Sequence, residues 1–196
     1  MAEITIEQIK KLKELSGVGL TDAKKALVEA NGDFDKALEA MRKKGLTKAE
    51  KRGDRETREG LIESYIHDGR LGAIVEVNCE TSFVAKTDEF KTLAHQIAMQ
   101  VASMNPLYVS ENDIPEDVVA AKKKELEANF KGPENMKDQI ISGQIKKAFA
   151  DKVLLNQPYI LDDTKTVEQF IKDNIAKTGE NITVRQFKRI ELGVTE

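Results

Sequence analysis

The sequence has little of what metal centres, disulfide scaffolds and base-stacking surfaces require. Its 196 residues include one cysteine, Cys79, two histidines, His67 and His95, and no tryptophan, and aromatic residues make up only 5%. A lone cysteine excludes an intramolecular disulfide and a Cys-rich zinc site. Two histidines provide few ligands for a site that binds any other metal. The small number of aromatic residues disfavours a platform for stacking bases. We therefore expect no metal site and no specific nucleic-acid binding.

An excess of one charge and a long hydrophobic run are also missing. Thirty-one Lys and Arg residues against 34 Asp and Glu give a net charge of -3, without the basic excess of a general nucleic-acid binder. No apolar run approaches the roughly 18–20 residues that span a bilayer. The start, MAEITIEQIKK, lacks the apolar core of a secretory signal and the Arg/Ser-rich bias of a transit peptide. The composition predicts a reduced, soluble, cytoplasmic protein without a membrane role.

Recognisable catalytic and nucleotide-binding motifs are missing too. The sequence contains no G-x-x-x-x-G-K-[ST] phosphate loop, and the glycines near Gly17 lie between predicted helices rather than after a strand. A Cys–His nucleophile would need Cys79 beside one of the histidines, whereas Cys79 follows an apolar strand and is more simply a core residue. The chain is therefore predicted to work by binding, with no cofactor and no direct nucleotide binding.

Residues 1–45 have the pattern of three short helices. Thr5 and Gln8 have the spacing of a capping box, residues 16–19 break the first helix, and Asn31-Gly32 ends the second. We expect the third helix to end at Gly45. Residues 46–60 then form a charged linker, with Gly53 and Gly60 as breakers. Such a small bundle has a marginal core alone, so it is interpreted as a binding module on a larger protein.

From Leu61 onward the pattern changes to that of an α+β domain, predicted to cover residues 61–196. Strands at 61–67 and 71–77 flank the turn dipeptide Asp68-Gly69. Helices follow, and a last strand carries Ile182, Val184, Ile190 and Leu192 in one alternating parity that Phe187 breaks. The expected fold is a small three-stranded antiparallel sheet with helices. Such a sheet can expose one face, and sheet-to-sheet homodimerisation is one way to cover it.

The helices of this second part are placed by local signals. Thr87 or Asp88 can cap a helix with a wide apolar face that Asn105-Pro106 ends. Pro115 and Pro133 suit the first turns of two charged helices, roughly 115–130 and 133–151. Residues 154–159 are predicted to be an extended connector, and Thr166 with Gln169 forms a second capping box.

Three segments, taken in order, resemble bacterial elongation factor Ts over essentially the whole chain. They are SGVGLTDAKKALVEANGDFDKALEAMRKKG (16–45), GRLGAIVEVNCETSFVAKTDEF (69–90), and the stretch from LLNQPYILDD through TGENITVRQFKRIELG (154–193). The resemblance implies a ubiquitin-associated-like three-helix module joined to an α+β dimerisation domain. It also implies that the protein promotes GDP release from its partner, the translational GTPase elongation factor Tu, and catalyses no chemical reaction of its own.

The resemblance also carries over site residues. Gly17, Val18, Gly19 and Leu20 match the family's helix-connecting loop that docks on the GTPase domain. From the residues alone, Leu20 is expected to be an ordinary core residue of the bundle, and the resemblance favours docking instead. Thr81, Ser82, Phe83 and Val84 stand where the family usually reads T-D-F-V. Phe83 matches the phenylalanine that wedges near the partner's magnesium–phosphate site; the local alternative is that Phe83 packs onto the following helix.

Two further features of the chain bear on the comparison with this family. Ser82 stands in place of the usual aspartate and cannot carry its charge. The resemblance therefore implies a steric disruption of the partner's magnesium–phosphate site by Phe83, without an electrostatic contribution from residue 82. His67, in the segment His67-Asp68-Gly69-Arg70, matches a hairpin that can reach another part of the GTPase. The chain has one copy of the hairpin-plus-helix unit where longer members have two, which implies a homodimer.

Other functions are weighed against the exchange factor. The first is a non-enzymatic adaptor that binds through its three-helix module alone. The second is an RNA- or ribosome-binding accessory protein that uses residues 43–58, which salt dependence would reveal. The third is a cysteine enzyme, which would lose activity on Cys79→Ser. Phe83 separates the first from the exchange factor, because exchange needs a second contact in the C-terminal domain.

Overall fold

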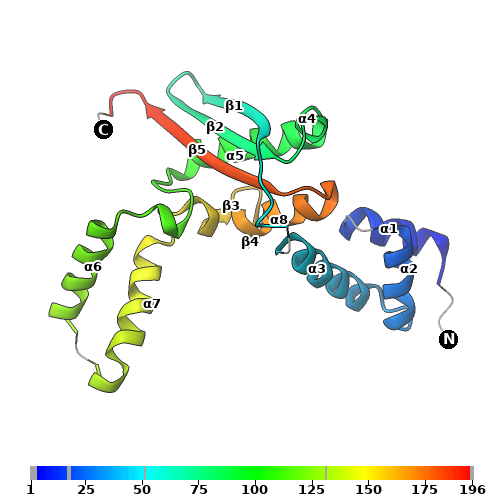
Figure 1. The fold of residues 1–196 in the computed structure, drawn as a ribbon, viewed down its shortest axis with the longest axis horizontal. Coiled ribbons are helices and arrows are strands. Elements are labelled where there is room, and N and C mark those ends of the chain that lie inside the picture. Colours follow the sequence, from blue (N-terminus) through cyan, green and yellow to red (C-terminus); the bar gives the residue numbers. More distant parts are fainter. Residues whose placement is uncertain (1–3, 17–18, 51, 131, 195–196) are drawn as a thin grey trace.

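The computed structural model describes residues 4–16, 19–50, 52–130 and 132–194 (Figure 1). Three N-terminal helices are followed by a small sheet with a helix against it, a projecting helical hairpin, and a final helix and strand. The mixture of helices with a three-stranded antiparallel sheet confirms the predicted α+β class. None of the helices in the described ranges is both long and apolar enough to cross a membrane.

The N-terminal module consists of α1 (Ile6–Ser16), α2 (Leu20–Glu29) and the first half of α3 (Phe34–Glu50). The predicted capping box is present in both directions: the Thr5 amide donates to Gln8 Oε1 at 3.0 Å, and the Gln8 amide donates to Thr5 Oγ1 at 3.2 Å. Asn31 and Gly32 adopt positive φ (53° and 83°) and end α2 as expected. The module has its own small core of Ile9, Leu12, Ala23, Ala26, Leu27, Ala37 and Met41.

The third helix is longer than predicted. The expected end at Gly45 is wrong, because α3 continues through this glycine to Glu50. Ala49, near its end, is buried in the main core, where α3 contacts α8 (Val167–Thr178). Burial there offsets the roughly 1 kcal/mol that a glycine costs inside a helix. The division into units at 1–45, 46–60 and 61–196 stays a prediction.

The sheet has the order β1-β2-β5 and is antiparallel throughout. β1 (Glu59–His67) and β2 (Leu71–Cys79) form the predicted hairpin, with Asp68 and Gly69 at φ 49° and 66° in the turn. Gly60 does not break the chain as expected. It lies inside β1 opposite Asn78, with φ at 149°.

Halfway along β5 (Ile182–Glu191), the alternation between core-facing and outward-facing residues reverses. Its register against β2 shifts between Glu76, which pairs with Gln186, and Val77, which pairs with Val184. The extra residue is a bulge that reverses the alternation. The predicted single parity is therefore wrong: Phe187 packs against the core, whereas Ile190 points outward.

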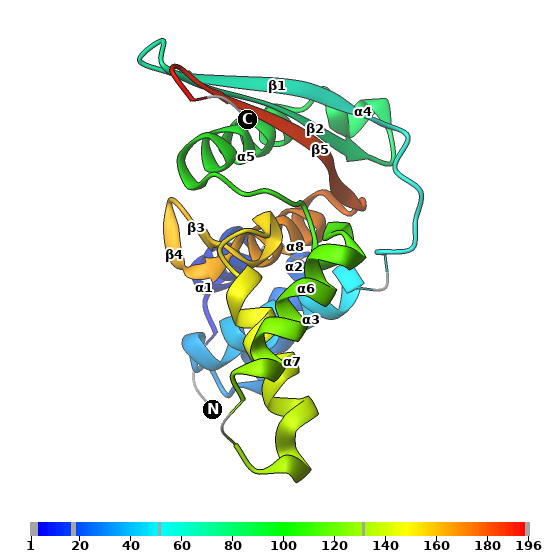
Figure 2. The same cartoon turned by 90° about the vertical axis from the view of Figure 1, so that its left-hand side faces the viewer.

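One face of the sheet is covered by α5 (Asp88–Met104) (Figure 2). Thr87 caps this helix through the Phe90 amide at 3.2 Å, and Asn105 ends it with φ at 46°, both as predicted. Between α5, α8 and the sheet lies the main core, which includes Val75, Val77, Cys79, Phe90, Leu93, Ile97, Val101, Leu154, Val167, Ile171, Ile182 and Val184. The opposite face of the sheet exposes Ile62, Ile66, Ile74 and Ile190.

A hairpin of α6 (Glu116–Ala128) and α7 (Lys137–Phe149) projects from this body (Figure 1). Short 3-10 turns precede both helices: η1 (Glu111–Asp113) and η2 (Glu134–Met136). Pro115 is the N-cap of α6, one position earlier than expected. Pro133 leads into η2, so α7 starts later than predicted.

The connection into the last helix was only partly predicted. Residues 154–159 are not simply extended, because they hold a 3-10 turn, η3 (Leu154–Asn156), and then β3 (Pro158–Tyr159). β3 pairs with β4 (Asp162–Thr166), a small hairpin that was not expected. Thr166 caps α8 through the Gln169 amide at 3.2 Å, while the Gln169 side chain bonds Asp173 at 3.0 Å instead of completing the capping box.

Candidate functional site

Phe83 lies on a very short helix that is anchored in the main core. This helix, α4 (Ser82–Ala85), follows the end of β2, and its N-cap Thr81 accepts a hydrogen bond from the Val84 amide at 3.4 Å. Val84 and Ala85 are buried in the main core. Phe83, in contrast, is 80% exposed, so it does not pack onto the following helix as the local alternative expected. The fold thus presents an aromatic ring to solvent on an anchored support.

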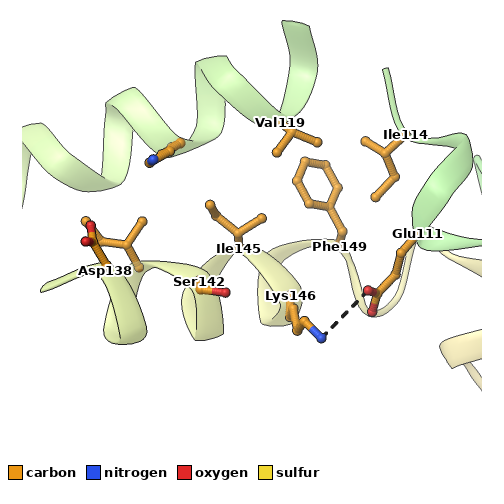
Figure 3. A pocket seen from close by; sticks show the side chains of 10 residues that line it. Glu111, Ile114, Val119, Asp138, Ser142, Ile145, Lys146 and Phe149 are labelled. Atoms are coloured by element: carbon orange, nitrogen blue, oxygen red, sulfur yellow. Dashed lines mark ion pairs between the residues drawn. The ribbon is translucent and has the colours of Figure 1, made fainter. Parts of the chain in front are cut away.

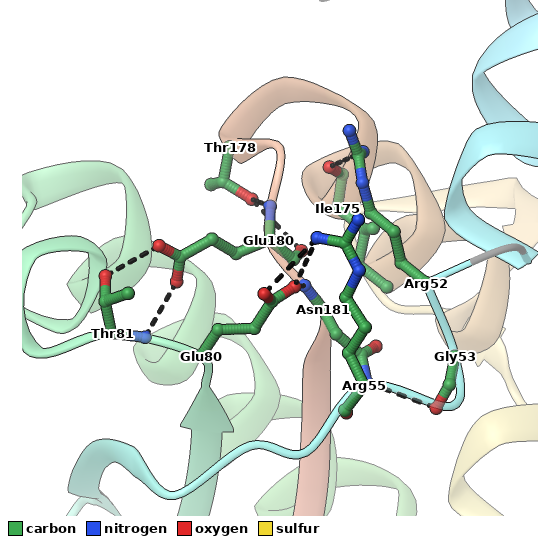
Figure 4. Close-up of polar contacts among 9 residues, drawn as sticks. All are labelled: Arg52, Gly53, Arg55, Glu80, Thr81, Ile175, Thr178, Glu180 and Asn181. Atoms are coloured by element: carbon green, nitrogen blue, oxygen red, sulfur yellow. Dashed lines mark hydrogen bonds and ion pairs between the residues drawn. The ribbon is translucent and has the colours of Figure 1, made fainter.

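Hydrogen bonds fix the position of Thr81 at the base of this loop. The Glu180 carboxylate accepts from the Thr81 amide at 3.0 Å and from the Thr81 hydroxyl at 2.6 Å (Figure 4). The Cys79 thiol donates to the Thr81 carbonyl at 3.2 Å. Of the four carried-over residues, Val84 is buried, Thr81 is exposed but held by hydrogen bonds, and Ser82 and Phe83 are exposed.

Cys79 has the surroundings of a core residue. Its side chain is fully buried at the end of β2, and burial raises the pKa of the thiol from its ordinary value of 9.0 to about 11, with the negative charges of Glu180 and Glu59 adding to the rise. Thiolate is the reactive form, so this environment suppresses nucleophilic chemistry. The geometry argues against a cysteine enzyme.

The second predicted site is the loop before α2, of which part is described. Gly17 and Val18 lie outside the described residues. Gly19 is the N-cap of α2, and a Cβ atom added there would meet nothing within 4 Å. Leu20 is 49% exposed and does not belong to the buried bundle core. Its side chain is therefore available to a partner rather than being ordinary core.

His67 lies at the far end of the sheet from Phe83. Its Nδ1 is 3.0 Å from the Tyr65 hydroxyl and its Nε2 is 3.7 Å from Asp68 Oδ2. β1 pairs Glu59 with Cys79, next to α4, and His67 with Leu71 at the other end. Eight residues of strand separate the two ends by roughly 26 Å. Figure 1 shows α4 and the N-terminal helices toward the same side of the molecule, with the β1–β2 turn on the other. The fold does not bring His67 together with Phe83.

Several residues around Phe83 were not anticipated as functional. Arg55, Glu80, Glu180 and Asn181 form a polar network beneath the loop (Figure 4). From the sequence, no role is assigned to Glu180 or Asn181. Their contacts join positions about a hundred residues apart, and a single sequence gives no signal for such pairing.

A groove between α6 and α7 is one of several concave features, with a volume of about 440 Å³ (Figure 3). Its floor is apolar and includes Ile114, Val119, Ile141, Ile145 and Phe149. At its rim Lys146 Nζ lies 3.9 Å from Glu111 Oε2. The groove is the seam of two packed helices. Within the described parts of the chain, no group of three or more His, Cys, Asp or Glu side chains could hold a metal ion.

Comparison with known proteins assigns the chain to a family. The family model described as Elongation factor TS matches residues 3–194. A protein named Elongation factor Ts from Thermotoga maritima is 51% identical over 193 residues, 97% of each chain. Namesakes from Rippkaea orientalis and Moorella thermoacetica are 52% and 48% identical, covering 98% and 97% of this chain and 80% and 96% of their own lengths. With a match over nearly its whole length, the chain belongs to the elongation factor Ts family.

Proposed function

We propose that the protein is a guanine-nucleotide exchange factor that accelerates GDP release from elongation factor Tu in the cytoplasm, without a chemical reaction of its own. The observation that carries the proposal is Phe83, an aromatic side chain left 80% exposed between the hydrogen-bonded Thr81 and the buried Val84 and Ala85. An exposed, rigidly held aromatic residue is typical of a binding hot spot. The family membership supplies the partner.

The proposed mechanism uses two contacts on one GTPase molecule. The loop before α2, with Leu20 half exposed at its end, docks on the GTPase domain. Phe83 then enters between GTPase helices near the nucleotide. The ring fits only the distorted, nucleotide-free state, so binding shifts the population toward that state. By linkage, whatever stabilises the nucleotide-free state weakens GDP binding by the same factor.

Ser82 makes the proposed wedge steric in character. It is exposed at the first position of α4, beside Phe83. A serine hydroxyl carries no charge to compete for magnesium, so the displacement of the metal site is assigned to the volume of the Phe83 ring. His67 is kept as a separate peripheral contact, because it lies at the other end of β1.

The homodimer belongs to the same proposal. The outer face of the sheet carries Ile62, Ile66, Ile74 and Ile190, which are between 48% and 76% exposed. Ser64, Glu76, Gln186 and Lys188 lie on the same face, so its apolar part centres on Ile66, Ile74 and Ile190 around Gly72. An exposed apolar patch of this kind often marks an interaction site. We assign it to a second copy of the chain, placed so that both Phe83 loops stay free at one end of their sheets.

The test is stopped-flow release of a fluorescent GDP analogue from the cognate elongation factor Tu. The unmodified protein is expected to accelerate release strongly. With Phe83→Ala, the acceleration of GDP release is expected to be about 30-fold smaller, because removing an interface hot spot costs about 2 kcal/mol. Leu161→Ala is the control, because it also shortens an exposed hydrophobic side chain, on the β3–β4 turn, and it should stay within about twofold of the unmodified protein.

Each alternative function gives a different result in this assay. An adaptor that uses only its three helices would bind the GTPase without accelerating release, and Phe83→Ala would not alter its affinity. An RNA-binding accessory protein would show affinity for RNA that falls steeply with salt. Strong acceleration that Phe83→Ala leaves intact would retain exchange but move the mechanism to the N-terminal loop or to His67.

A further inference from the structure

We propose that Asn181 is a positioning residue that fixes the distance between the N-terminal docking loop and Phe83. The inference rests on the proposed exchange function and concerns how its two contacts act together. Asn181 lies in the turn between α8 and β5 and is only 2% exposed. It bonds on one side to the segment that leaves α3 and on the other to the residue that precedes the Phe83 loop.

The bonds on the first side tie down the segment after the N-terminal module. The Asn181 side-chain amide donates to the carbonyls of Gly53 at 3.2 Å and Arg55 at 2.8 Å. One step earlier in the chain, Arg52 Nη1 donates to the Ile175 carbonyl at 3.4 Å, in the last turn of α8. A cation at a helix C-terminus is a favourable pairing. The segment that sequence reasoning treats as a solvated linker is therefore attached to the core.

The bonds on the second side hold the Phe83 loop (Figure 4). The Asn181 backbone amide donates to Glu80 Oε1 at 2.6 Å, and Arg55 Nη1 lies 3.4 Å from both oxygens of the same carboxylate. The adjacent Glu180 grips Thr81 through two hydrogen bonds. Glu80 and Thr81 directly precede α4, so the turn that holds the linker also holds the support of Phe83.

The end of α3 is fixed in the same region. Ala49 is buried in the main core, where α3 contacts α8. The end of α3 and the loop that carries Phe83 are thus both held near the same turn, between α8 and β5, although they are far apart in the sequence. Asn181 bonds through its side chain to Gly53 and Arg55, which follow α3, and through its backbone amide to Glu80, which precedes the Phe83 loop.

A fixed spacing matters because the two contacts must act on the GTPase at once. When one contact forms, a rigid connection raises the effective concentration of the other at its target. A loose connection loses this gain to conformational freedom. Docking through the module would then continue, but Phe83 would reach its wedging position less often. Loosening the turn should lower the maximal rate of GDP release and leave the half-saturating concentration nearly unchanged.

The first experiment measures the spacing without any partner. Cysteines are placed at the exposed Lys24 on α2 and the exposed Lys86 after α4, spin-labelled, and mixed with excess unlabelled protein. Pulsed electron resonance then gives the distance distribution within one chain. Asn181→Ala is expected to broaden this distribution. The control is Asn156→Ala, which removes a hydrogen bond to Glu111 beside the α6–α7 hairpin and should leave the distribution narrow.

The second experiment measures exchange kinetics with unlabelled variants. Asn181→Ala is expected to lower the maximal rate of GDP release by about tenfold, equivalent to one or two lost hydrogen bonds, with a half-saturating concentration within about twofold. The double variant with Phe83→Ala should lose less than the product of the two single losses, because both act on one step. Asn181→Asp keeps the side-chain shape but cannot donate to the Gly53 and Arg55 carbonyls, so it provides a second test if Asn181→Ala fails to fold.

The outcomes separate this inference from the function on which it rests. An unchanged distance distribution in the Asn181 variant overturns the positioning role. So does a broadened distribution with unchanged exchange, or a loss seen only in the half-saturating concentration. No acceleration by the unmodified, folded protein would instead overturn the exchange function. Broadening together with a lower maximal rate establishes the positioning role.

Discussion

Cys79 illustrates how the surroundings of one residue decide its chemistry. The pKa of its thiol is raised to about 11, chiefly by burial, so at pH 8 the native protein holds very little thiolate. Relative to a pKa of 9.0, that rise slows alkylation about 100-fold before steric protection is counted. We expect iodoacetamide to leave native Cys79 unmodified at pH 8 and to label it in denaturant. Mass spectrometry measures the labelling, and rapid modification of the native protein would contradict this prediction.

The same shift predicts a pH dependence of stability. The folded state favours the protonated thiol, since its pKa there is about 11 against an ordinary value of 9.0. The raised pKa of the Cys79 thiol therefore contributes fully to the free energy of unfolding below pH 9, and this contribution is lost as the pH rises to about 11. Denaturant unfolding of the unmodified protein and of Cys79→Ala measures this effect. Their difference should shrink over that interval and stay constant between pH 7 and 8.

Gly60 is required by the backbone of β1. Its φ is 149°, and an added Cβ atom would lie 2.2 Å from the Val77 carbonyl oxygen. Gly60→Ala is therefore expected to lower the free energy of unfolding by about 1–3 kcal/mol, the usual cost of a strained backbone position. Gly143→Ala is the control, since an added Cβ there, inside α7, meets nothing within 4 Å. Equal stability of the two variants in urea would refute the argument.

At the scale of elements, the joint between α4 and α5 depends on Thr87. Its hydroxyl accepts from the Phe90 amide at 3.2 Å and donates to the Val84 carbonyl at 2.8 Å. Thr87→Ala should lower the free energy of unfolding by about 1 kcal/mol, the typical value of an N-cap. Thr92→Ala, at an exposed position within the same helix, should be neutral or slightly stabilising because alanine favours helix. Urea unfolding of both variants decides the matter.

Local signals located most elements and missed those that depend on distant contacts. The caps at Thr5, Thr87 and Thr166 and the turn at Asp68-Gly69 were readable, because each depends on residues within four positions. Two of the features that were not readable show the reason. One is the end of α3, which burial of Ala49 against α8 extends past Gly45. The other is the bulge in β5, which pairing with β2 imposes.

The candidate site shows the same division. Phe83 and Leu20 were found through the family resemblance, and the structure adds that both are exposed. Glu80, Glu180 and Asn181 were not found, because their roles consist of bonds across about a hundred residues of chain. Sequence motifs thus indicate which residues face a partner, whereas the residues that hold them in place emerge only from the fold.

At the scale of the whole molecule, the remaining question is what covers the outer face of the sheet. In the register of β1, β2 and β5, Ile66 and Ile190 flank Gly72 on that face, with Ile74 and Ile62 further along. A glycine between two exposed isoleucines leaves room for side chains from an opposing sheet. Its repetition on a second copy would give a self-complementary interface, as two-fold symmetry requires.

A charge on this face is expected to break the dimer. Ile66→Lys or Ile190→Lys would place an ammonium group in an apolar interface, where desolvation costs several kcal/mol. Sedimentation should show a dimer for the unmodified protein and a monomer for either variant. Leu161→Lys, at an exposed position on the β3–β4 turn and away from the sheet, should remain a dimer. If the unmodified protein is a monomer at micromolar concentration, or if both sheet variants stay dimeric, the face serves another contact.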